Sequence, residues 1–304
     1  MTKIRKAVIP AAGYGTRMLP VTKTVPKELL PLVDKPVIQM VVEELVEAGI
    51  EEIIIVLAEG RHEVARYFGD VDAGLKRHLL AGGPHKAALL EEIEAVKGLA
   101  TFTYVDLIEE PGIYGTGNPV LWAEPALKGE PFIYTFADDF FVARKNSYAQ
   151  MIEAYERYQA PIIGCQLRTN DADYDRYGYV GGDRQADGEL LVGTVIERPG
   201  KANKPGDLAS LGGFIVTPEV LTYLHEVRKH VHTGKEFYFN AALGNMIKDG
   251  KKVIAKEIKN AEYYDTGNKL EYMKTVVAMA VRHPEIGADF QKFLQGFVNT
   301  EGSK

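Results

Sequence analysis

Short apolar segments that alternate with helical stretches constrain the fold of this chain most. The segments are 6–11 (KAVIPA), 52–58 (EIIIVLA), 101–107 (TFTYVDL) and 131–138 (PFIYTFAD). Each is apolar enough to be covered on both faces, which is typical of central strands in a parallel sheet. Between the first two segments, Pro36 favours a helix start and Gly49 a helix end. This βαβ pattern predicts an α/β fold with a right-handed crossover.

The rest of the chain continues the alternation and then changes texture. Residues 60–100 are expected to be helical with a break at 81–85, because the glycines and proline there interrupt a single helix. Short β stretches with Gly-rich turns over 177–199 indicate an antiparallel insertion. The remaining predicted elements are a helix at 144–160, a buried strand at 161–168, and helices at 218–231, 235–249, 267–282 and 284–296.

We therefore expect a Rossmann-like α/β fold, with a mostly parallel central sheet, helices on both faces and an antiparallel β insertion. The main domain is predicted over 1–283, followed by a helical C-terminal tail over 284–304. Ile286, Phe290, Phe293 and Phe297 recur at helical spacing in that tail. Such a face docks on its own domain or on a second copy, and we expect a homo-oligomer.

Charge and composition exclude several classes of protein. The chain has 304 residues and a formal net charge of −6, which argues against a general nucleic-acid or anionic-membrane binder because both rely on a positive field. No segment has the length of a membrane span, and the first ten residues lack a secretory apolar region, so a cytoplasmic protein is expected. The single Cys165 lies in an apolar run, which predicts a buried thiol.

The loop after the first strand carries the clearest chemical signal. Gly13 and Gly15 allow backbone N–H groups to cradle phosphate oxygens. The dinucleotide fingerprint fails because Met18 stands where its third glycine belongs, and the Walker A pattern fails because no Lys-Ser or Lys-Thr closes the loop. Arg17 suits a bidentate grip on phosphate, and Lys27 supplies a compact charge. The loop therefore predicts a site for a nucleoside triphosphate.

The same loop resembles a known family. The segments AAGYGTRMLP (11–20) and PKELLPLVDKP (26–36) are similar to the signature of nucleotidyltransferases that join a nucleoside triphosphate to a sugar 1-phosphate. The likeness is closest to the bacterial UTP:glucose-1-phosphate uridylyltransferases. It extends in family order through 115–125, 137–141, 176–180, 195–199, 211–216 and 265–273.

The resemblance implies a specific reaction. An oxygen of glucose 1-phosphate attacks the α-phosphorus of UTP and expels pyrophosphate, giving UDP-glucose, with Mg²⁺ bridging phosphate oxygens and carboxylates. Arg17, Lys27 and Asp138 match the family's catalytic positions, and Asp138 and Asp265 match its metal ligands. Asp139 is adjacent, but successive strand side chains point to opposite faces, so we expect only Asp138 to face the ion.

The resemblance also implies which residues bind the nucleotide: Ala12, Gly13, Gly15, Thr16, Glu110 and Gly115. The family reads the base with a glutamine, and here its place is taken by Glu110 or, with a one-residue deletion, by Pro111. A carboxylate accepts the N3–H of uracil but repels the flanking carbonyl oxygens, whereas guanine presents N1–H beside an amino group. UTP is the first expectation, and dTTP or GTP stays open.

The sugar phosphate is expected to contact Gly178, Glu197, Arg198 and Gly213. The family usually has lysine where this chain has Arg198, so a planar fork replaces a point charge. The segment 234–246, which borders the sugar pocket in the family, also departs from the usual acidic and polar pattern. The nucleotide half is predicted at about 1–140 and the sugar-phosphate half at about 141–283. A different sugar, or a homologue that binds sugar nucleotides without turnover, remains the alternative.

Overall fold

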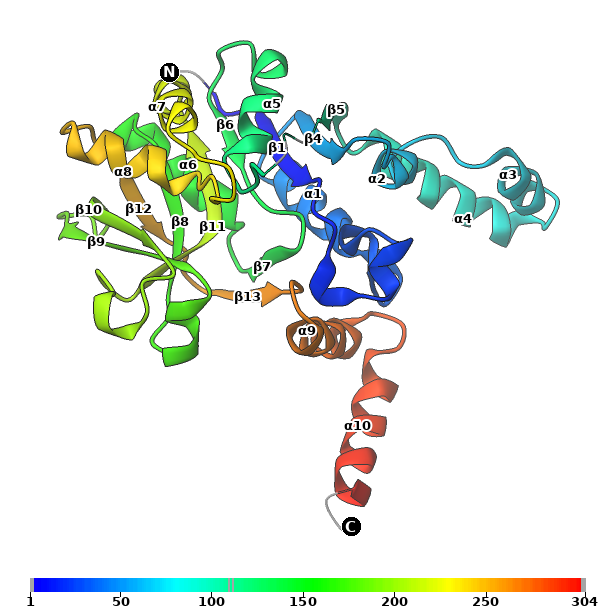
Figure 1. Ribbon diagram of the computed structural model, residues 1–304. Coiled ribbons are helices and arrows are strands. Elements are labelled where there is room, and N and C mark those ends of the chain that lie inside the picture. The colour runs from blue at the N-terminus through cyan, green and yellow to red at the C-terminus, as the bar shows by residue number, and fades with distance from the viewer. Residues whose placement is uncertain (1–2, 109, 111, 302–304) are drawn as a thin grey trace.

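The computed structural model describes residues 3–108, 110 and 112–301, and its main feature is one large sheet (Figure 1). In the described residues nine strands form this sheet in the order β5-β4-β1-β6-β11-β8-β12-β10-β9. Their bounds are β1 Lys6–Ala11, β4 Glu52–Ala58, β5 Thr101–Leu107, β6 Phe132–Tyr134, β8 Ile162–Leu167, β9 Gly178–Arg184, β10 Leu190–Glu197, β11 Leu208–Val216 and β12 Ile254–Glu257. Strands from both predicted halves therefore belong to the same sheet.

The pairing directions divide the sheet. Strands β5, β4, β1 and β6 are parallel neighbours, and β8 is parallel to β12. The pairings of β11 with β6, β8 and β9, and of β10 with β9 and β12, are antiparallel. Two short sheets stand apart: β2 (Pro31–Leu32) with β3 (Lys35–Pro36), and β7 (Asp139–Ala143) with β13 (Ala261–Asp265).

Alternate side chains of the central strands are buried in two different hydrophobic cores, one on each face of the sheet. In β1, Ala7 and Ile9 belong to one core and Val8 to the other. In β4, Ile55 and Ile54 divide in the same way. This follows from the two-residue repeat of a strand, whose side chains alternate between the faces of a sheet. A strand that is apolar throughout is thus explained by helices on both faces, and the predicted α/β class is confirmed. The expectation of a mostly parallel sheet is wrong, because parallel and antiparallel pairings are mixed and the antiparallel β9 and β10 belong to the same sheet.

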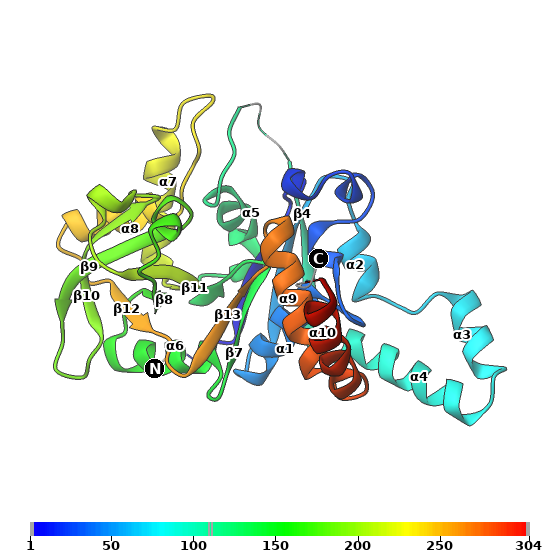
Figure 2. The same ribbon diagram turned by 90° about the horizontal axis from the view of Figure 1, so that it is seen from below.

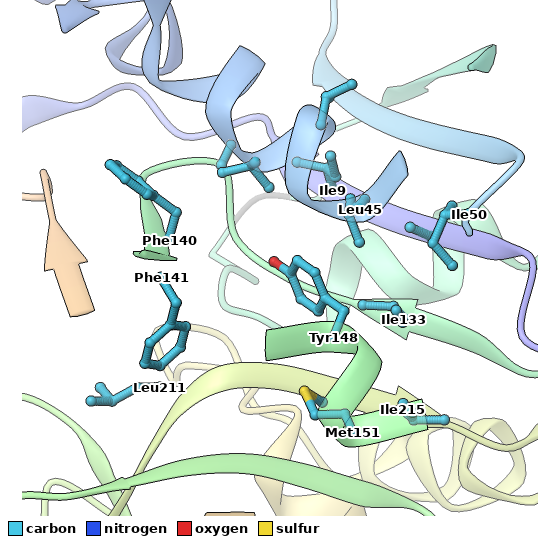
Figure 3. Packing of buried hydrophobic residues seen from close by; sticks show 14 of the residues in the cluster. Ile9, Leu45, Ile50, Ile133, Phe140, Phe141, Tyr148, Met151, Leu211 and Ile215 are labelled. Carbon is cyan, nitrogen blue, oxygen red and sulfur yellow. The ribbon is translucent and has the colours of Figure 1, made fainter. Parts of the chain in front are cut away.

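Helices α1 and α6 cover one face, and α5, α7 and α8 cover the other. Figure 3 shows Leu45 of α1 and Tyr148 and Met151 of α6 beside strand residues such as Ile133. The helices are α1 Val37–Glu47, α2 Glu63–Tyr67, α3 Ala73–Leu80, α4 Pro84–Ala95, α5 Asn118–Leu127, α6 Ser147–Tyr158, α7 Pro218–Lys229, α8 Asn240–Lys248, α9 Lys269–Arg282 and α10 Gly287–Glu301.

Two strand predictions need correction. The segment 101–107 is not a central strand covered on both faces, because β5 is the edge strand and Thr101, Tyr104 and Asp106 are exposed. Its exposed residues lie on both faces of the sheet, while Phe102 packs against one core and Val105 and Leu107 against the other, so β5 is a partly covered edge strand. The predicted strand 131–138 is shorter than expected, because β6 ends at Tyr134.

Two helix predictions also shift. The helix expected at 235–249 begins only at Asn240, because the preceding segment is held in an extended conformation by the chain around Tyr114. The Phe237 N–H donates to the Tyr114 carbonyl at 2.7 Å, and the Gly117 N–H donates to the Phe237 carbonyl at 2.8 Å. The last helix begins at Gly287 and continues to Glu301, beyond the predicted end at residue 296.

The C-terminal helices lie apart from the main sheet. Helix α9 packs on β13 and β2, and α10 contacts α9 and then projects from the body, as does the α3–α4 arm on another side (Figures 1 and 2). Phe293 and Phe297 of α10 remain largely exposed, so the homo-oligomer stays a prediction. Within the described residues, no helix combines the length and apolar character needed to cross a membrane.

Candidate active site

Two adjoining cavities open where β1 and β6 end. The larger, of about 530 Å³, is lined by the loop after β1, by Lys27 and by the segment 112–116; we call it the nucleotide cavity. The smaller, of about 240 Å³, is lined by the ends of β9 and β10 and by residues around 236–240; we call it the sugar cavity. Thr116, Phe136 and Asp138 line both. Ligands in the two cavities would therefore share contacts with these three residues.

The loop after β1 is folded tightly against Lys27. Gly15 has a φ of 61°, and a Cβ there would lie 3.0 Å from Thr22 Cγ2 and 3.2 Å from Lys27 Cβ. The Thr22 hydroxyl donates to the Gly15 carbonyl at 2.8 Å and closes the loop. Thr16 begins a short 3₁₀ helix, Thr16–Met18, that carries Arg17. Gly15 is thus required by the backbone, because a side chain there would be strained and crowded.

Lys27 and Asp138 form the central ion pair. The Lys27 ammonium donates to Asp138 Oδ2 at 2.6 Å. Burial is the largest single effect and disfavours the charged ammonium, but the attraction of Asp138 and that of Glu28 together outweigh it and raise the pKa of Lys27 above its ordinary value. Lys27 therefore stays charged in the nucleotide cavity, where it faces Gly13 and the end of β1.

Asp138, Asp265 and Arg17 converge on one point. A Cβ placed on Gly267 would lie 3.0 Å from Asp265 Oδ1, 3.6 Å from Asp138 Oδ2 and 3.8 Å from Arg17 Nη1. Because Gly267 has no side chain, this space is left to a ligand. Among the described residues, no group of three or more His, Cys, Asp or Glu side chains is arranged to hold a metal. Two carboxylates fit Mg²⁺, which keeps several waters and takes further oxygens from phosphates.

Asp139 also lines the sugar cavity, but its carboxylate has a different partner from that of Asp138. It accepts a hydrogen bond from the Tyr263 hydroxyl at 3.0 Å, whereas Asp138 faces Lys27. Burial, followed by repulsion from Asp138 and Asp265, raises the pKa of Asp139 well above its usual range. The register of the small sheet pairs Asp139 with Asp265, and this pairing brings Asp265 to the site.

Glu197 and Gly178 face each other across β10 and β9. A Cβ on Gly178 would lie 3.1 Å from both Glu197 Oε1 and Asn240 Nδ2, so the glycine leaves room for that contact. The Asn240 amide donates to Glu197 Oε1. Burial raises the pKa of Glu197, and the bond from Asn240 opposes the shift. The carboxylate is thus oriented with its edge in the sugar cavity.

Arginines gather beside the sugar cavity. Arg198 has a φ of 45° and is held through its N–H, which donates to the Tyr177 carbonyl at 3.1 Å. Arg176 donates to Asp265 Oδ2 at 2.6 Å. Together with Arg17 these two line a further cavity of about 340 Å³. Asp175 and Asp265 line the same cavity, so Arg17 and Arg198 are the described cations left to contact phosphate groups there.

Arg176 and Asn240 were missed by sequence reasoning. Arg176 opens the motif RYGYV, two residues before the predicted site residue Gly178. Its positive charge in that motif was the signal that could have identified it. Asn240 lies in the segment that departs from the family pattern, so no motif pointed to it.

Not every predicted residue lines the two cavities. Ala12, Gly13, Lys27, Glu110, Gly115 and Asp138 line the nucleotide cavity, and Arg17, Asp138, Gly178, Glu197, Arg198 and Asp265 line the sugar cavity. Gly15 and Thr16 line neither of these two cavities and lie in the turn that leads to Arg17. Gly213 has a φ of 74°, and a Cβ there would lie 2.6 Å from the Tyr134 carbonyl oxygen. The close approach at Gly213 is therefore to the protein's own strand β6, and its contact with the sugar phosphate stays a prediction.

The position expected to read the base carries a charged side chain. Glu110 lines the nucleotide cavity, and its carboxylate accepts a hydrogen bond from Arg228 of α7. Pro111, the other residue considered for this position, lies outside the described residues. A Cβ on Gly115 would lie 2.6 Å from the Phe237 carbonyl oxygen, so this glycine is needed where the chain crosses segment 236–237.

Comparisons with known proteins agree with this geometry. The family model described as nucleotidyl transferase matches residues 6–280. The UTP–glucose-1-phosphate uridylyltransferase of Bacillus subtilis (strain 168) is 36% identical over 301 residues, covering 99% of each chain. The protein of the same name from Staphylococcus epidermidis (strain ATCC 12228) is 33% identical over 295 residues, covering 97% of this chain and 99% of the other.

Solved structures are similar over most of the chain. A UDP-glucose pyrophosphorylase complexed with UDP-glucose superposes with a TM-score of 0.78 and 31% identity, covering 90% of this chain and 98% of the other. A UTP-bound UGPase from Acinetobacter baumannii gives a TM-score of 0.84 and 28% identity, covering 96% and 99%. The chain therefore belongs to the nucleotidyl transferase family, in which it groups with the bacterial UTP–glucose-1-phosphate uridylyltransferases.

Proposed function

We propose that this protein transfers the uridylyl group of UTP to glucose 1-phosphate and releases pyrophosphate. The observation that carries the proposal is the pair of adjoining cavities that meet at Asp138, one beside Lys27 and the other beside Glu197 and Arg198. Two polyanionic substrates must be brought together for this reaction, and the cations of the site lie on both sides of the junction. Relatives named for this activity, similar over nearly the whole chain, support the choice of substrates.

Each substrate has its own set of residues in this proposal. The triphosphate lies along Ala12, Gly13 and Lys27, with Arg17 at the junction. Glu197 accepts hydrogen bonds from sugar hydroxyls, and Arg198 contacts the sugar phosphate. A phosphate oxygen of the sugar attacks the α-phosphorus in line, and the bond from that phosphorus to the bridging oxygen breaks, so that pyrophosphate leaves with the electron pair.

Asp138 and Asp265 are the residues that would hold Mg²⁺. When bound, Mg²⁺ neutralises charge on the phosphate oxygens and fixes their orientation. The chain's own contribution is to place Lys27 at the phosphates and to keep it charged through the carboxylates of Asp138 and Glu28. Arg17 and Arg198 add charge from the opposite side, where bidentate contacts orient the two phosphate groups.

The nucleobase is assigned to the part of the nucleotide cavity bordered by Glu110, Tyr114 and Gly115. The ion pair with Arg228 offsets the charge of Glu110, which weakens its repulsion of the uracil carbonyl oxygens. Guanine is the second candidate base, because a carboxylate accepts both N1–H and the amino group. The division into a nucleotide half at about 1–140 and a sugar-phosphate half at about 141–283 belongs to the same proposal.

A matrix of substrates tests the proposal. Purified protein with Mg²⁺ is incubated with UTP, dTTP, GTP, ATP or CTP against glucose 1-phosphate and other sugar 1-phosphates, and pyrophosphate release is measured. The highest kcat/KM is expected for UTP with glucose 1-phosphate. Turnover with another pair alone would correct the substrates. If no pair reacts but UDP-glucose raises the Tm, the chain is a binding homologue without catalysis.

A further inference from the structure

Glu28, the residue after Lys27, is buried, and neither oxygen of its carboxylate accepts a hydrogen bond from another described residue. Its side chain has no exposure, and among the described buried side chains it is the one whose two oxygens both lack a partner. Burial raises its pKa to about 7, against the opposing attraction of Lys27. An unsatisfied buried carboxyl destabilises a fold, so its presence calls for another explanation.

The surroundings of Glu28 point to Lys27. Glu28 Oε1 lies 3.9 Å from the Lys27 ammonium, which at the same time donates to Asp138 at 2.6 Å. The two carboxylates differ in access, since Asp138 lines both cavities and Glu28 lines neither. Asp138 is therefore the carboxylate that would hold a metal ion bound in the cavities, in competition with Lys27 for its oxygens. Glu28 stays available to the ammonium because it is closed off from the cavities.

We propose that Glu28 is a positioning residue for nucleotidyl transfer, and that its buried carboxyl holds the Lys27 ammonium in the nucleotide cavity while Asp138 binds a metal ion. This inference rests on the proposed function of the site. With a metal ion on Asp138, Lys27 would lose that carboxylate as its partner. If Glu28 were also absent, neither carboxylate would hold the ammonium in place. The flexible four-carbon stem of Lys27 would then place the ammonium less accurately at the phosphates.

Glu44 provides a matched comparison within the same chain. Its carboxyl is also buried, and burial raises its pKa to about 7. Unlike Glu28, it accepts hydrogen bonds from the Ser147 hydroxyl and, at 3.4 Å, from the Phe141 N–H. Glu44 therefore stabilises the packing of α1 against α6 and β7, whereas no hydrogen bond accounts for the burial of Glu28.

The test compares thermal stability and kinetics in two pairs of variants. Glu28→Met removes an unpaired carboxyl from an apolar site, so the Tm of the metal-free protein should rise by roughly 2–4 °C. Glu44→Met leaves the Ser147 hydroxyl and the Phe141 N–H unpaired, so its Tm should fall. Glu28→Gln should lower kcat at least about tenfold and change the KM for UTP less than about threefold, because the ground-state contacts of UTP remain. Glu44→Gln should keep kcat within about twofold.

The possible outcomes distinguish a failure of the proposed function from a failure of the positioning role of Glu28. If the parent protein turns over no substrate pair, the proposed function fails, whatever the variants do. If the parent is active and both Glu28 variants keep kcat within about twofold of it, the positioning role is wrong. If Glu28→Met and Glu28→Gln both lower the Tm, Glu28 is part of the structural framework and the inference is equally wrong. Only a higher Tm in Glu28→Met together with a loss of kcat in Glu28→Gln supports it.

Discussion

Lys27 and Asp138 lie 111 positions apart in the sequence and form an ion pair of 2.6 Å beside the shared wall of the two cavities. The pair joins the loop after β1 to the connection between β6 and β7, and β1 and β6 are parallel neighbours. A cation for phosphate and a carboxylate for metal are thus preassembled at one point. In the substrate complex Lys27 would contact the phosphates and Asp138 would hold the metal ion. A substitution at each residue therefore tests a different contact.

Lys27→Met is expected to reduce kcat/KM for uridylyl transfer by about a thousandfold, because a partly buried charge at the phosphates is lost. Lys23→Met in the same loop is the control, since Lys23 is exposed and its loss removes a similar charge. Steady-state pyrophosphate release measures both variants. Equal effects of the two substitutions would mean that the loop attracts anions only through its general charge.

Asp138→Asn should lower turnover about a hundredfold or more while UTP affinity stays within roughly tenfold, as for a metal ligand that acts on the transition state. The Mg²⁺ concentration that gives half-maximal rate should rise at the same time. Asp183→Asn, at an exposed position of β9, is the matched control. Normal turnover and an unchanged Mg²⁺ requirement in Asp138→Asn would place the metal on other residues.

Arg198→Gln should raise the KM for glucose 1-phosphate at least about tenfold and leave the KM for UTP within about threefold, because its guanidinium borders the sugar cavity. Arg198→Lys, which restores the residue usual in the family, should keep most of the activity. Arg184→Gln, at the exposed end of β9, serves as the control. A change in the UTP KM alone would assign Arg198 to the other substrate.

Glu110→Gln should increase the ratio of kcat/KM for UTP to that for GTP by about tenfold, because an amide can accept from N3–H and donate to a carbonyl oxygen of uracil. The two triphosphates are measured in parallel on parent and variant. Arg228→Gln, which removes the ion pair of Glu110, should shift the ratio toward GTP. An unchanged ratio in both variants would show that main-chain groups alone read the base.

Stability should depend on pH through Glu44. Burial raises its folded-state pKa from 4.5 to about 7, so the folded form retains a proton that the unfolded chain releases. The resulting stability is complete below pH 4.5 and is lost as the pH rises through about 7. Between pH 5 and 8 the parent should therefore lose stability relative to Glu44→Gln, by up to roughly 3 kcal/mol. Urea unfolding of both proteins at each pH measures the difference, with exposed Glu153→Gln as the control. A constant difference across this range would contradict the prediction.

The sequence by itself determined the first βαβ unit and the chemistry of the loop. The uninterrupted apolar runs of β1 and β4 required cover on both faces, and Pro36 and Gly49 bracket helix α1, which spans Val37–Glu47. The glycines and cations of residues 13–27 indicated a phosphate site. These signals are local, because a strand or helix repeats within a few residues and a loop motif is continuous in the chain.

Only the tertiary structure decided which distant groups meet. Asp265 reaches the site because β13 pairs with β7 in a register that sets it opposite Asp139, and no local pattern encodes that register. Arg176 became a site residue through its bond to Asp265, and Glu28 became notable only because the fold closes over it. Burial and contact depend on strand order and on the layers above and below. The residues alone therefore named the chemistry, and the packing decided where each charge lies.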